Sequence, residues 1–288
     1  MELPELVEGR LVRRYRRFLA DVRLVGGADT GARSVQVRGA PHRPKAGLAG
    51  TGSGVEPLGT RAGPGMAGGA VVTVHCPNTG SLRGCAEPGL RVWLSRSANP
   101  RRRLPWTWEL VETASGALVC INTARSNALV AEAIAAGRVP ALAGYATLRR
   151  EVRFGREGSR VDLLLEDPAR GRCFVEVKHV TAVDGEGLAI FPDAATARGR
   201  RHLRELAHHR AAGDRAVALF CVARADAQRL RPADEIDPAY GEALRAAVAA
   251  GVEALALGCD VTLEHVVVSR QLGMSLAGYV GRRPTRID

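Results

Sequence analysis

The chain has 288 residues, of which 46% are apolar, 25% are charged and 4% are aromatic. This composition is typical of a globular protein with two domains of ordinary size. No apolar run approaches the roughly 18 residues that a membrane-spanning helix needs. Residues 1–10 contain acids and lack the apolar segment of a secretory signal. We therefore expect a cytoplasmic protein with no membrane contact, and its oligomeric state stays open.

The net charge of +11 favours a polyanionic partner such as DNA, RNA or an acidic surface. Among the 41 basic residues, only Lys45 and Lys178 are lysines. Nearly every position that needs only a positive charge is thus occupied by arginine and not by lysine. An ammonium is compact and directs its three donors freely, which a planar guanidinium cannot do. Because Lys45 lies in a glycine-rich stretch, Lys178 is the lysine whose position is expected to require an ammonium.

Six cysteines are spread over the whole chain and form no CxxC pair. In a cytoplasmic protein, scattered thiols are usually core residues. We therefore expect neither disulfides nor a zinc site.

The N-terminal part has the pattern of β-structure. Strands are predicted over residues 6–15 and 18–25, and strand character resumes over 71–75. The segment 26–70 between them contains 13 of the 33 glycines and four prolines, and it has no aromatic residue. It cannot bury a core, so we expect a flexible insert that expands the turn of a hairpin.

Further strands are predicted over residues 90–95, 106–112 and 117–121. Residues 1–123 would then form a small all-β domain of five or six strands. An OB-like β-barrel is the expected fold, and a generic β-sandwich is the alternative.

After residue 123 helical and strand patterns alternate. Helices are predicted over 127–137, 196–212 and 237–250, and strands over 148–154, 160–166, 173–178, 216–222 and 252–257. This order predicts an α/β sandwich with a mixed sheet over residues 124–265, with a meander first and parallel crossovers later. Residues 266–288 are expected to be a basic tail of uncertain order.

The predicted hairpin over 160–178 gathers three charged residues. If its turn centres on Ala169, antiparallel pairing places Asp162 directly opposite Glu176, with Cβ atoms about 5 Å apart. Lys178 lies two residues beyond Glu176 and therefore emerges on the same face. The opposite face is expected to consist of Val161, Leu163, Leu165, Val175 and Val177.

Two neighbouring carboxylates in an apolar sheet repel each other and cost free energy unless they are compensated. A divalent cation would compensate them, and hard oxygen ligands select Mg²⁺ or Mn²⁺. The predicted ligands are Asp162, Glu176 and the main-chain carbonyl of Val177. Lys178 would orient the attacking water and stabilise developing charge. The alternative is a structural ion pair between Lys178 and one of the acids.

A further carboxylate would complete such a site. Glu132, on the predicted helix, and Glu151, on the preceding strand, are the candidates. Because Glu132 lies in an otherwise apolar helix that should pack over the sheet, it is preferred as the fourth catalytic residue.

The arrangement of Asp162, Glu176 and Lys178 resembles the PD-(D/E)xK nuclease superfamily. Longer motifs resemble the sugar fermentation stimulation protein A family, SfsA, over about 3–25 and 71–262. They are Arg13-Arg14-Tyr15-Arg16-Arg17-Phe18-Leu19-Ala20-Asp21-Val22, His75-Cys76-Pro77-Asn78-Thr79-Gly80-Ser81, Gly84-Cys85-Ala86-Glu87-Pro88-Gly89, Phe191-Pro192-Asp193-Ala194 and Thr196-Ala197-Arg198-Gly199 with His202-Leu203.

The resemblance implies an OB-like N-terminal domain, a restriction-endonuclease-like C-terminal domain, DNA binding and a regulatory link to sugar (maltose) utilisation. Catalytic activity is implied by the resemblance to the nuclease superfamily and is less settled for the SfsA family. The chain departs from the family pattern over 26–70 and after about 265.

Three groups of residues are candidates for nucleic-acid binding. Basic residues near aromatic ones suit an OB-type surface that holds phosphates and stacks bases, although a solvated face with core tryptophans fits equally well. The polar loop could hold a phosphate, bridge the domains or be a plain turn. A helix start with adjacent arginines attracts phosphate. The candidates are Arg13, Arg14, Arg16, Arg17, Arg101 and Arg102 beside Trp106 and Trp108; Asn78, Thr79 and Ser81; and Thr196, Arg198 and His202.

The sequence thus favours a Mg²⁺- or Mn²⁺-dependent DNA nuclease, with single- and double-stranded DNA both possible. One alternative is a DNA-binding regulator of sugar metabolism that does not cut. The other is RNA binding through the OB-like domain, which we regard as the weaker hypothesis.

Overall fold

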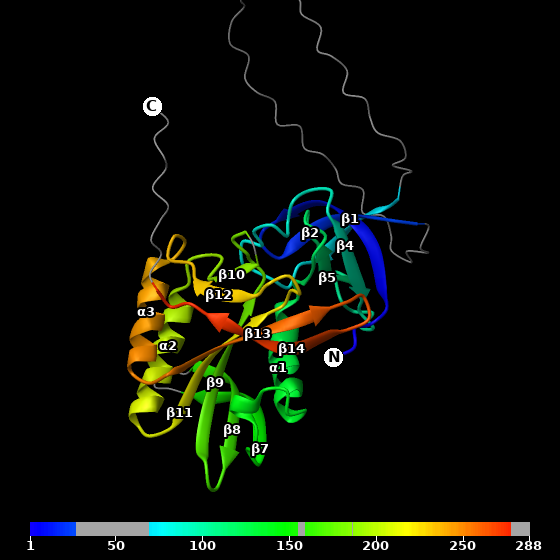
Figure 1. The fold of residues 1–288 in the computed structure, drawn as a ribbon. Coiled ribbons are helices and arrows are strands. Elements are labelled where there is room, and N and C mark those ends of the chain that lie inside the picture. The colour runs from blue at the N-terminus through cyan, green and yellow to red at the C-terminus, as the bar shows by residue number, and fades with distance from the viewer. Residues whose placement is uncertain (27–68, 155–158, 186, 278–288) are drawn as a thin grey trace, which may run out of the picture.

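We analysed a computed structural model of the chain, which describes residues 1–26, 69–154, 159–185 and 187–277. Two β-sheets form the framework, one in each half of the chain (Figure 1). The insert predicted over 26–70 lies almost entirely outside the described residues, as does the end of the tail after 277.

The first sheet is a barrel. It consists of β1 (Leu6–Tyr15), β2 (Leu19–Leu24), β3 (Val71–His75), β4 (Arg91–Arg96), β5 (Trp106–Glu112) and β6 (Leu118–Cys120), in the order β3-β2-β1-β4-β5-β6. A pairing between His75 and Thr107 joins β3 to β5 and closes the barrel. Antiparallel pairing of β2 with β3 confirms the hairpin around the insert. The OB-like prediction is confirmed.

The second sheet has eight strands in the order β10-β12-β14-β13-β11-β9-β8-β7. Its strands are β7 (Thr147–Phe154), β8 (Ser159–Asp167), β9 (Gly171–Val180), β10 (Leu188–Phe191), β11 (Arg215–Val222), β12 (Arg229–Pro232), β13 (Glu253–Val261) and β14 (Val266–Met274). β7, β8 and β9 form an antiparallel meander, and β9, β11 and β13 run parallel. This confirms the predicted mixed sheet.

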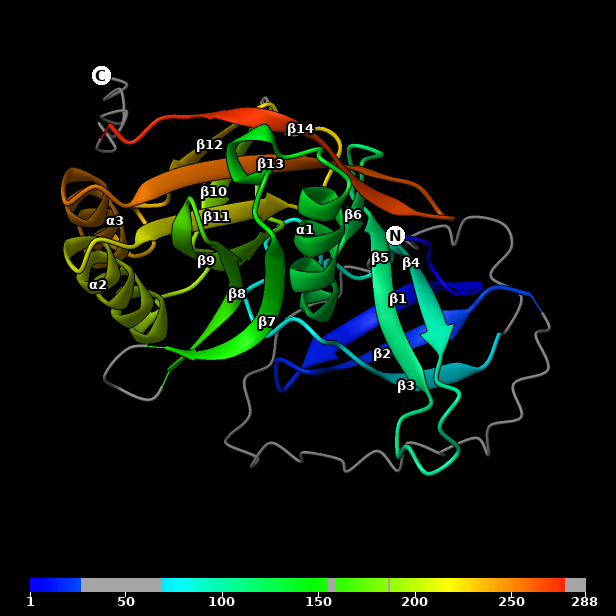
Figure 2. The same cartoon turned by 90° about the horizontal axis from the view of Figure 1, so that it is seen from below.

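Helices cover both faces of this sheet. α1 (Ser126–Ala135) packs on one face against β8, β9 and β14, whereas α2 (Ala197–Ala211) and α3 (Pro238–Ala249) pack on the other (Figure 2). The side chains of Thr196 and Asp237 accept hydrogen bonds from the first turns of α2 and α3, which fixes where these helices begin. Two short 3₁₀ helices, η1 (Thr123–Arg125) and η2 (Pro140–Leu142), flank α1.

Three strands of this sheet did not follow from the sequence pattern. β10 and β12 have only four residues each, and β12 consists largely of arginine and proline. β14 corrects the expectation of a basic tail from residue 266, because Val266–Met274 pairs with both β13 and β12. Ser269, Arg270 and Gln271 interrupt its apolar pattern, so the sequence conceals the strand.

The barrel and the α/β sandwich share a core. Trp93, Leu110 and Cys120 of the barrel belong to the same hydrophobic cluster as α1 and the sheet face beneath it. His179 is partly buried and follows the predicted active-site lysine. Its ring lies within hydrogen-bonding distance of the Cys120 carbonyl (2.9 Å) and of the Ser126 hydroxyl (2.6 Å). Burial lowers the pKa of His179 to about 4, so the ring is neutral. The strand that carries Glu176 is therefore attached to the barrel.

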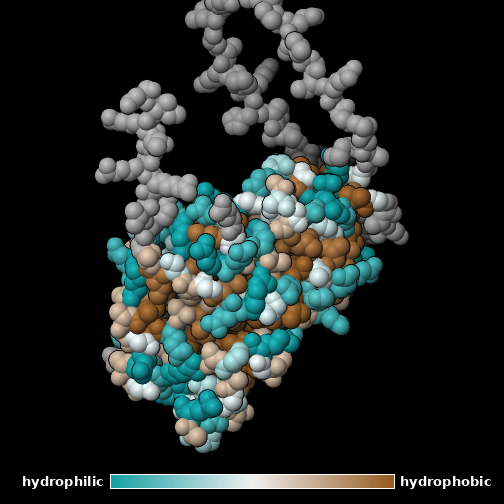
Figure 3. All heavy atoms as spheres, viewed as in Figure 1, coloured by the Kyte–Doolittle hydropathy of each residue, from teal (hydrophilic) through white to brown (hydrophobic). Residues whose placement is uncertain are grey.

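No helix in the described part of the chain is long and apolar enough to cross a membrane. Hydrophobic side chains gather over the barrel strands at the upper right of Figure 3. Four of the exposed large apolar side chains are on or beside β1, β2 and β3: Val12, Phe18, Val25 and Val71. All six cysteines are buried and free, as expected.

Candidate active site at the fork between two strands

β8 and β9 separate at the position where the charged residues lie. Their pairing begins with Asp167 and Gly171 and ends with Leu163 and Val175, which is the register expected for a turn centred on Ala169. Beyond Leu163, β8 stays paired with β7 and β9 stays paired with β11. The expectation that Asp162 and Glu176 are directly paired is therefore wrong. The two residues lie on the two arms of a fork instead.

The side-chain alternation of β8 changes direction at Asp162. Leu163 and Leu165 contact the α1 side of the sheet, whereas Val161 packs with the α2–α3 side. The prediction that Val161 shares a face with Leu163 is wrong for this reason. On the neighbouring strand, Glu151 has a left-handed backbone (φ 55°). Between the pairs Arg150–Leu163 and Val152–Val161 the two strands are thus locally distorted without a shift in register, and Asp162 turns toward the fork.

The Asp162 carboxylate fills part of the fork. It accepts hydrogen bonds from the main-chain N–H of Val177 (2.7 Å) and from the Asn127 side chain (2.9 Å). Burial and the neighbouring charge of Glu176 raise the pKa of Asp162 to about 6, although these hydrogen bonds and Lys178 act in the opposite direction. Proximity to Glu176 therefore destabilises the ionised form of Asp162.

Glu176 points toward α2 and is 3% exposed. One of its oxygens, Oε1, contacts Lys178 Nζ (2.7 Å) and His202 Nδ1. Burial raises the pKa of Glu176, but the hydrogen bond from His202 and the charge of Lys178 outweigh it, so the pKa is lowered overall. The other oxygen, Oε2, is buried and has no hydrogen-bond partner. A buried carboxylate oxygen without a partner is costly unless a ligand satisfies it.

His202 is held in one orientation from both sides. Arg198 Nε donates to His202 Nε2 (3.3 Å), and because a guanidinium can only donate, the ring proton is assigned to Nδ1, which faces Glu176. His202, expected to contact nucleic acid, is thus buried against Glu176, whereas the Arg198 side chain is exposed and its role in binding nucleic acid stays a prediction. Sequence spacing gives little signal for this contact, because it joins α2 to β9.

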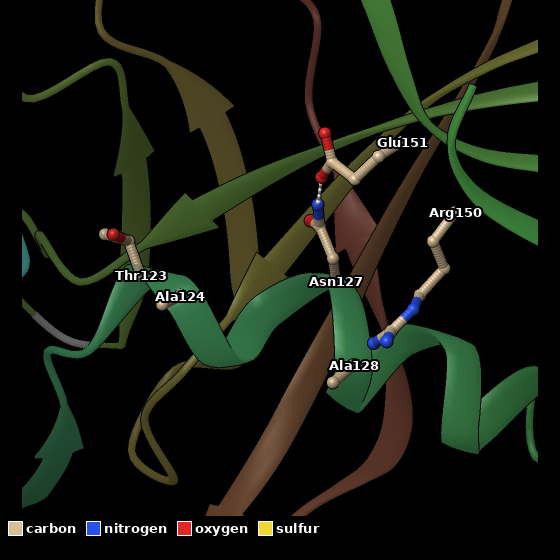
Figure 4. Close-up of a pocket in the computed structure, with 6 residues that line it drawn as sticks. All are labelled: Thr123, Ala124, Asn127, Ala128, Arg150 and Glu151. Atoms are coloured by element: carbon tan, nitrogen blue, oxygen red, sulfur yellow. Dashed lines mark hydrogen bonds between the residues drawn. The ribbon is translucent and has the colours of Figure 1, made fainter. Parts of the chain in front are cut away.

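An open pocket of about 660 Å³ lies between the start of α1 and β7 (Figure 4). The Asn127 amide forms part of its wall and donates to both Glu151 Oε1 and Asp162 Oδ1, at 2.9 Å each. The pocket is lined by Thr123, Ala124, Asn127, Ala128, Arg150 and Glu151.

Comparison with known proteins identifies the chain. The family model described as "Sugar fermentation stimulation protein RE domain" matches residues 124–265, and the one described as "SfsA N-terminal OB domain" matches residues 61–121. A sugar fermentation stimulation protein homolog from Pseudomonas paraeruginosa is 49% identical over 95% of this chain and 98% of its own length. The chain belongs to the SfsA family.

Other members of the family also match this chain over nearly its whole length. A homolog from Thioalkalivibrio sulfidiphilus is 48% identical over 95% of this chain and 97% of its own length. A solved structure, described as Pyrococcus furiosus SfsA in complex with Ca²⁺, superimposes with a TM-score of 0.73 at 26% identity and covers 96% of this chain and 98% of that one. The two-domain architecture is therefore shared along the whole length.

Glu132 does not lie at the candidate site formed by Asp162, Glu176 and Lys178. It contacts the N-terminal amine of Met1 (2.9 Å) and Arg138 (3.0 Å), and its side chain is 43% exposed. Five helical residues rotate a side chain by about 140°, so Glu132 cannot share a face with Asn127. The preference for Glu132 over Glu151 is corrected accordingly. Asn127 was missed, although its spacing from buried Val130 and Ile134 places it on the inward side of α1.

Three of the six barrel arginines predicted to bind nucleic acid have side-chain partners within the described part of the protein. Arg13 pairs with Asp21 (2.8 Å), and Arg102 donates to Thr107 (2.8 Å). Arg14 donates to four carbonyls, those of Arg17, Asn78, Gly80 and Ser81. The side chains of Arg16, Arg17 and Arg101 are exposed. Trp106 and Trp108 are 4% and 0% exposed, so they are core residues and cannot stack bases.

The polar loop at 77–81 bridges the two domains. The Asn78 side chain is buried and accepts from Gly80 N, whereas Thr79 is exposed. Ser81 Oγ and Leu82 N both donate to Asp193, which precedes α2. A Cβ atom at Gly80 would lie 2.4 Å from the Asp193 carboxylate, so the loop can approach only as glycine. Of the three alternatives for this loop, the bridging role is the one observed.

Proposed function

We propose that the fork holds a divalent cation, Mg²⁺ or Mn²⁺, and that the protein is a phosphodiester-cleaving DNA nuclease of the PD-(D/E)xK type. The observation that carries the proposal is the unpartnered Glu176 Oε2, buried across the fork from a carboxyl whose pKa is raised. A perturbed carboxyl beside a buried carboxylate oxygen that lacks a partner is typical of a functional site.

The residues present fit such a cation. Asp162 and Glu176 offer hard oxygen ligands, and the Val177 carbonyl is the proposed third ligand from the protein. Among the described residues, no three His, Cys, Asp or Glu side chains cluster closely enough to hold a metal alone. Water and substrate oxygens would therefore complete the coordination, as is common for Mg²⁺. The relative described with Ca²⁺ supports a cation site in the family.

When bound, the cation would polarise the phosphodiester and lower the pKa of an attacking water. The protein's own residues prepare the site for this chemistry. His202 and Lys178 both hold Glu176 Oε1, which leaves Oε2 for the ligand. The Val177 N–H and Asn127 orient Asp162. The Lys178 ammonium supplies positive charge where charge develops on the phosphate.

DNA is the proposed substrate because the net charge of +11 favours a polyanion. The alternative is a DNA-binding regulator that acts without cutting, consistent with the link to sugar fermentation in the family name. It is favoured by the Lys178–Glu176 contact, since this pair would also stabilise the fold as a simple ion pair. Cytoplasmic location is part of both proposals.

Incubation with single-stranded, nicked and branched DNA tests the proposal, with Mg²⁺, with Mn²⁺ and with EDTA. We expect cation-dependent cleavage that falls about 10²- to 10³-fold in Lys178→Ala and in Glu176→Gln. Asp260→Asn, which removes an exposed acid of β13, is the matched control and should retain the rate. Absence of cleavage on every substrate, or full activity in Lys178→Ala, would favour the regulator.

A further inference from the structure

Three arginines lie on the outer strands of the second sheet, next to the fork. β7 is the edge strand and pairs with β8, so that Arg153 is opposite Arg160 and Arg150 is opposite Leu163. These arginines were not among the residues that the sequence singled out. Their position follows from the register of the two strands.

All three side chains belong to the α1 side of the sheet. Val152 and Phe154 pack on the α2–α3 side, so Arg153 between them faces the other way, together with Arg160 across the rung. Arg150 is opposite Leu163, which packs on the α1 side. The left-handed residue at 151 explains how residues 150 and 153 can share a face.

Among the residues that the structure describes, no acidic side chain pairs with these three arginines. Arg149, on the other face, pairs with Glu166 (2.7 Å). Within the described ranges, Arg150, Arg153 and Arg160 have no ion pair or hydrogen bond of their side chains, and Arg153 and Arg160 are exposed. Like charges directly opposite each other in a sheet repel. An anion bound between them would remove that cost.

This basic edge continues into the pocket beside the fork. Arg150 lines the pocket together with Asn127 and Glu151, and Asn127 contacts Asp162. Three residues of a strand span roughly 10 Å. The charges of one DNA strand follow each other at about 3.4 Å of rise along the helix axis, so the basic edge is long enough to contact more than one phosphate. Its spacing and charge suit a nucleic-acid backbone better than a single small anion.

We propose that Arg150, Arg153 and Arg160 form a phosphate track that holds the DNA strand leading into the carboxylate site. The inference rests on the proposed function, because it takes DNA as the substrate. It adds a surface on β7 and β8, outside the barrel, as the place where the DNA backbone is bound.

The test uses fluorescence anisotropy with a labelled DNA oligonucleotide, single-stranded and duplex, in Ca²⁺ and in EDTA. The double variant Arg153→Gln/Arg160→Gln is compared with Arg210→Gln/Arg229→Gln, which removes two exposed arginines from α2 and β12 and leaves the same net charge. We expect the first variant to bind about tenfold more weakly, and its plot of log affinity against log salt to be shallower by about 1.8 for duplex or 1.4 for single strands. The control should change less than twofold.

Equal weakening in both variants, or wild-type affinity in the first, would overturn the track. Tighter binding of the same sequence as RNA would overturn DNA as its ligand. Thermal unfolding shows whether the Arg153→Gln/Arg160→Gln variant is folded. Removal of two repelling charges should leave its unfolding midpoint unchanged or raise it. Since binding is measured without cleavage, a track variant that loses affinity supports the track even if the wild type never cuts DNA.

Discussion

The fork between β8 and β9 and the basic region of the barrel each place a buried acid beside basic residues, but the acids differ in their partners. In the barrel, buried Asp21 accepts from Arg13, Tyr15 and Thr73, and its pKa is lowered because these hydrogen bonds outweigh the cost of burial. At the fork, Glu176 keeps an unpartnered oxygen and the pKa of Asp162 is raised. Charges that have partners stabilise the fold, whereas charges left without partners indicate a ligand.

The largest effect is expected from Trp108→Ala in the barrel. The ring is fully buried, and its Nε1 donates to the Leu110 carbonyl (2.9 Å). The substitution should reduce the free energy of unfolding by about 3–5 kcal/mol, as measured by chemical denaturation. The milder Trp108→Phe should remain folded and bind DNA with unchanged affinity. A loss of DNA affinity without loss of stability would mean that the barrel stacks bases after all.

Asp162→Asn should increase the free energy of unfolding, whereas Trp108→Ala lowers it. The pKa of Asp162 rises from 3.8 to about 6 on folding, so its ionised form destabilises the cation-free protein above about pH 6 and not below about pH 4. The substitution should therefore add about 1–2 kcal/mol of stability at pH 7 to 8, since one pKa unit corresponds to about 1.4 kcal/mol and one hydrogen bond is weakened. Urea unfolding at several pH values in EDTA measures this.

Asp21→Asn is the paired experiment in the barrel. Because the pKa of Asp21 is lowered, its ionised form stabilises the protein at neutral pH, and the contribution is lost as the pH falls. This substitution should destabilise the protein by about 1–3 kcal/mol. If both substitutions changed stability in the same direction, the contrast between the two regions would fail.

His202→Ala should weaken cation binding by about tenfold. His202 Nδ1 and Lys178 Nζ both contact Glu176 Oε1 and so hold the carboxylate with Oε2 available to a cation. The substitution removes the first of these two contacts. Calorimetric titration with Mn²⁺ or Ca²⁺ measures this independently of cleavage. His202→Asn places an amide donor near the position of Nδ1 and should restore part of the affinity. His208→Ala, on the exposed side of the same helix, is the control. Unchanged affinity in His202→Ala would reduce His202 to a packing role.

Much of the fold could be predicted from the sequence because its signals are local. The strand over 71–75 and the helix that starts after Asp237 have clear alternation or a clear cap. The turn around Ala169 gave the register of the site hairpin correctly as far as Leu163. β14 was missed, because polar residues interrupt it and its pairing with β12 and β13 is long-range.

The sequence predicted that Asp162, Glu176 and Lys178 lie near one another, but not their geometry. A periodic strand pattern cannot reveal the local distortion that turns Asp162 toward the fork. His202 and Asn127 reach the site from helices on opposite sides of the sheet. Contacts between elements distant in sequence depend on tertiary packing, which spacing along the chain does not encode.

The smallest expected effect tests whether unpartnered charge also marks function in the barrel. In the described structure, the exposed Arg101 side chain has no partner, whereas Arg102 donates to Thr107 and lies 3.1 Å from His75 Nδ1. Arg101→Gln should change stability by less than about 0.5 kcal/mol. Arg102→Gln should cost about 1 kcal/mol.

In DNA binding we expect Arg101→Gln to make the salt dependence shallower by about 0.9, the contribution of one duplex phosphate contact. Anisotropy titrations at several salt concentrations measure this slope. An unchanged slope in Arg101→Gln would mean that Arg101 contacts no phosphate. In that case an unpartnered arginine on the barrel would be ordinary solvated charge, and only a group that is both unpartnered and buried, such as Glu176, would indicate a ligand.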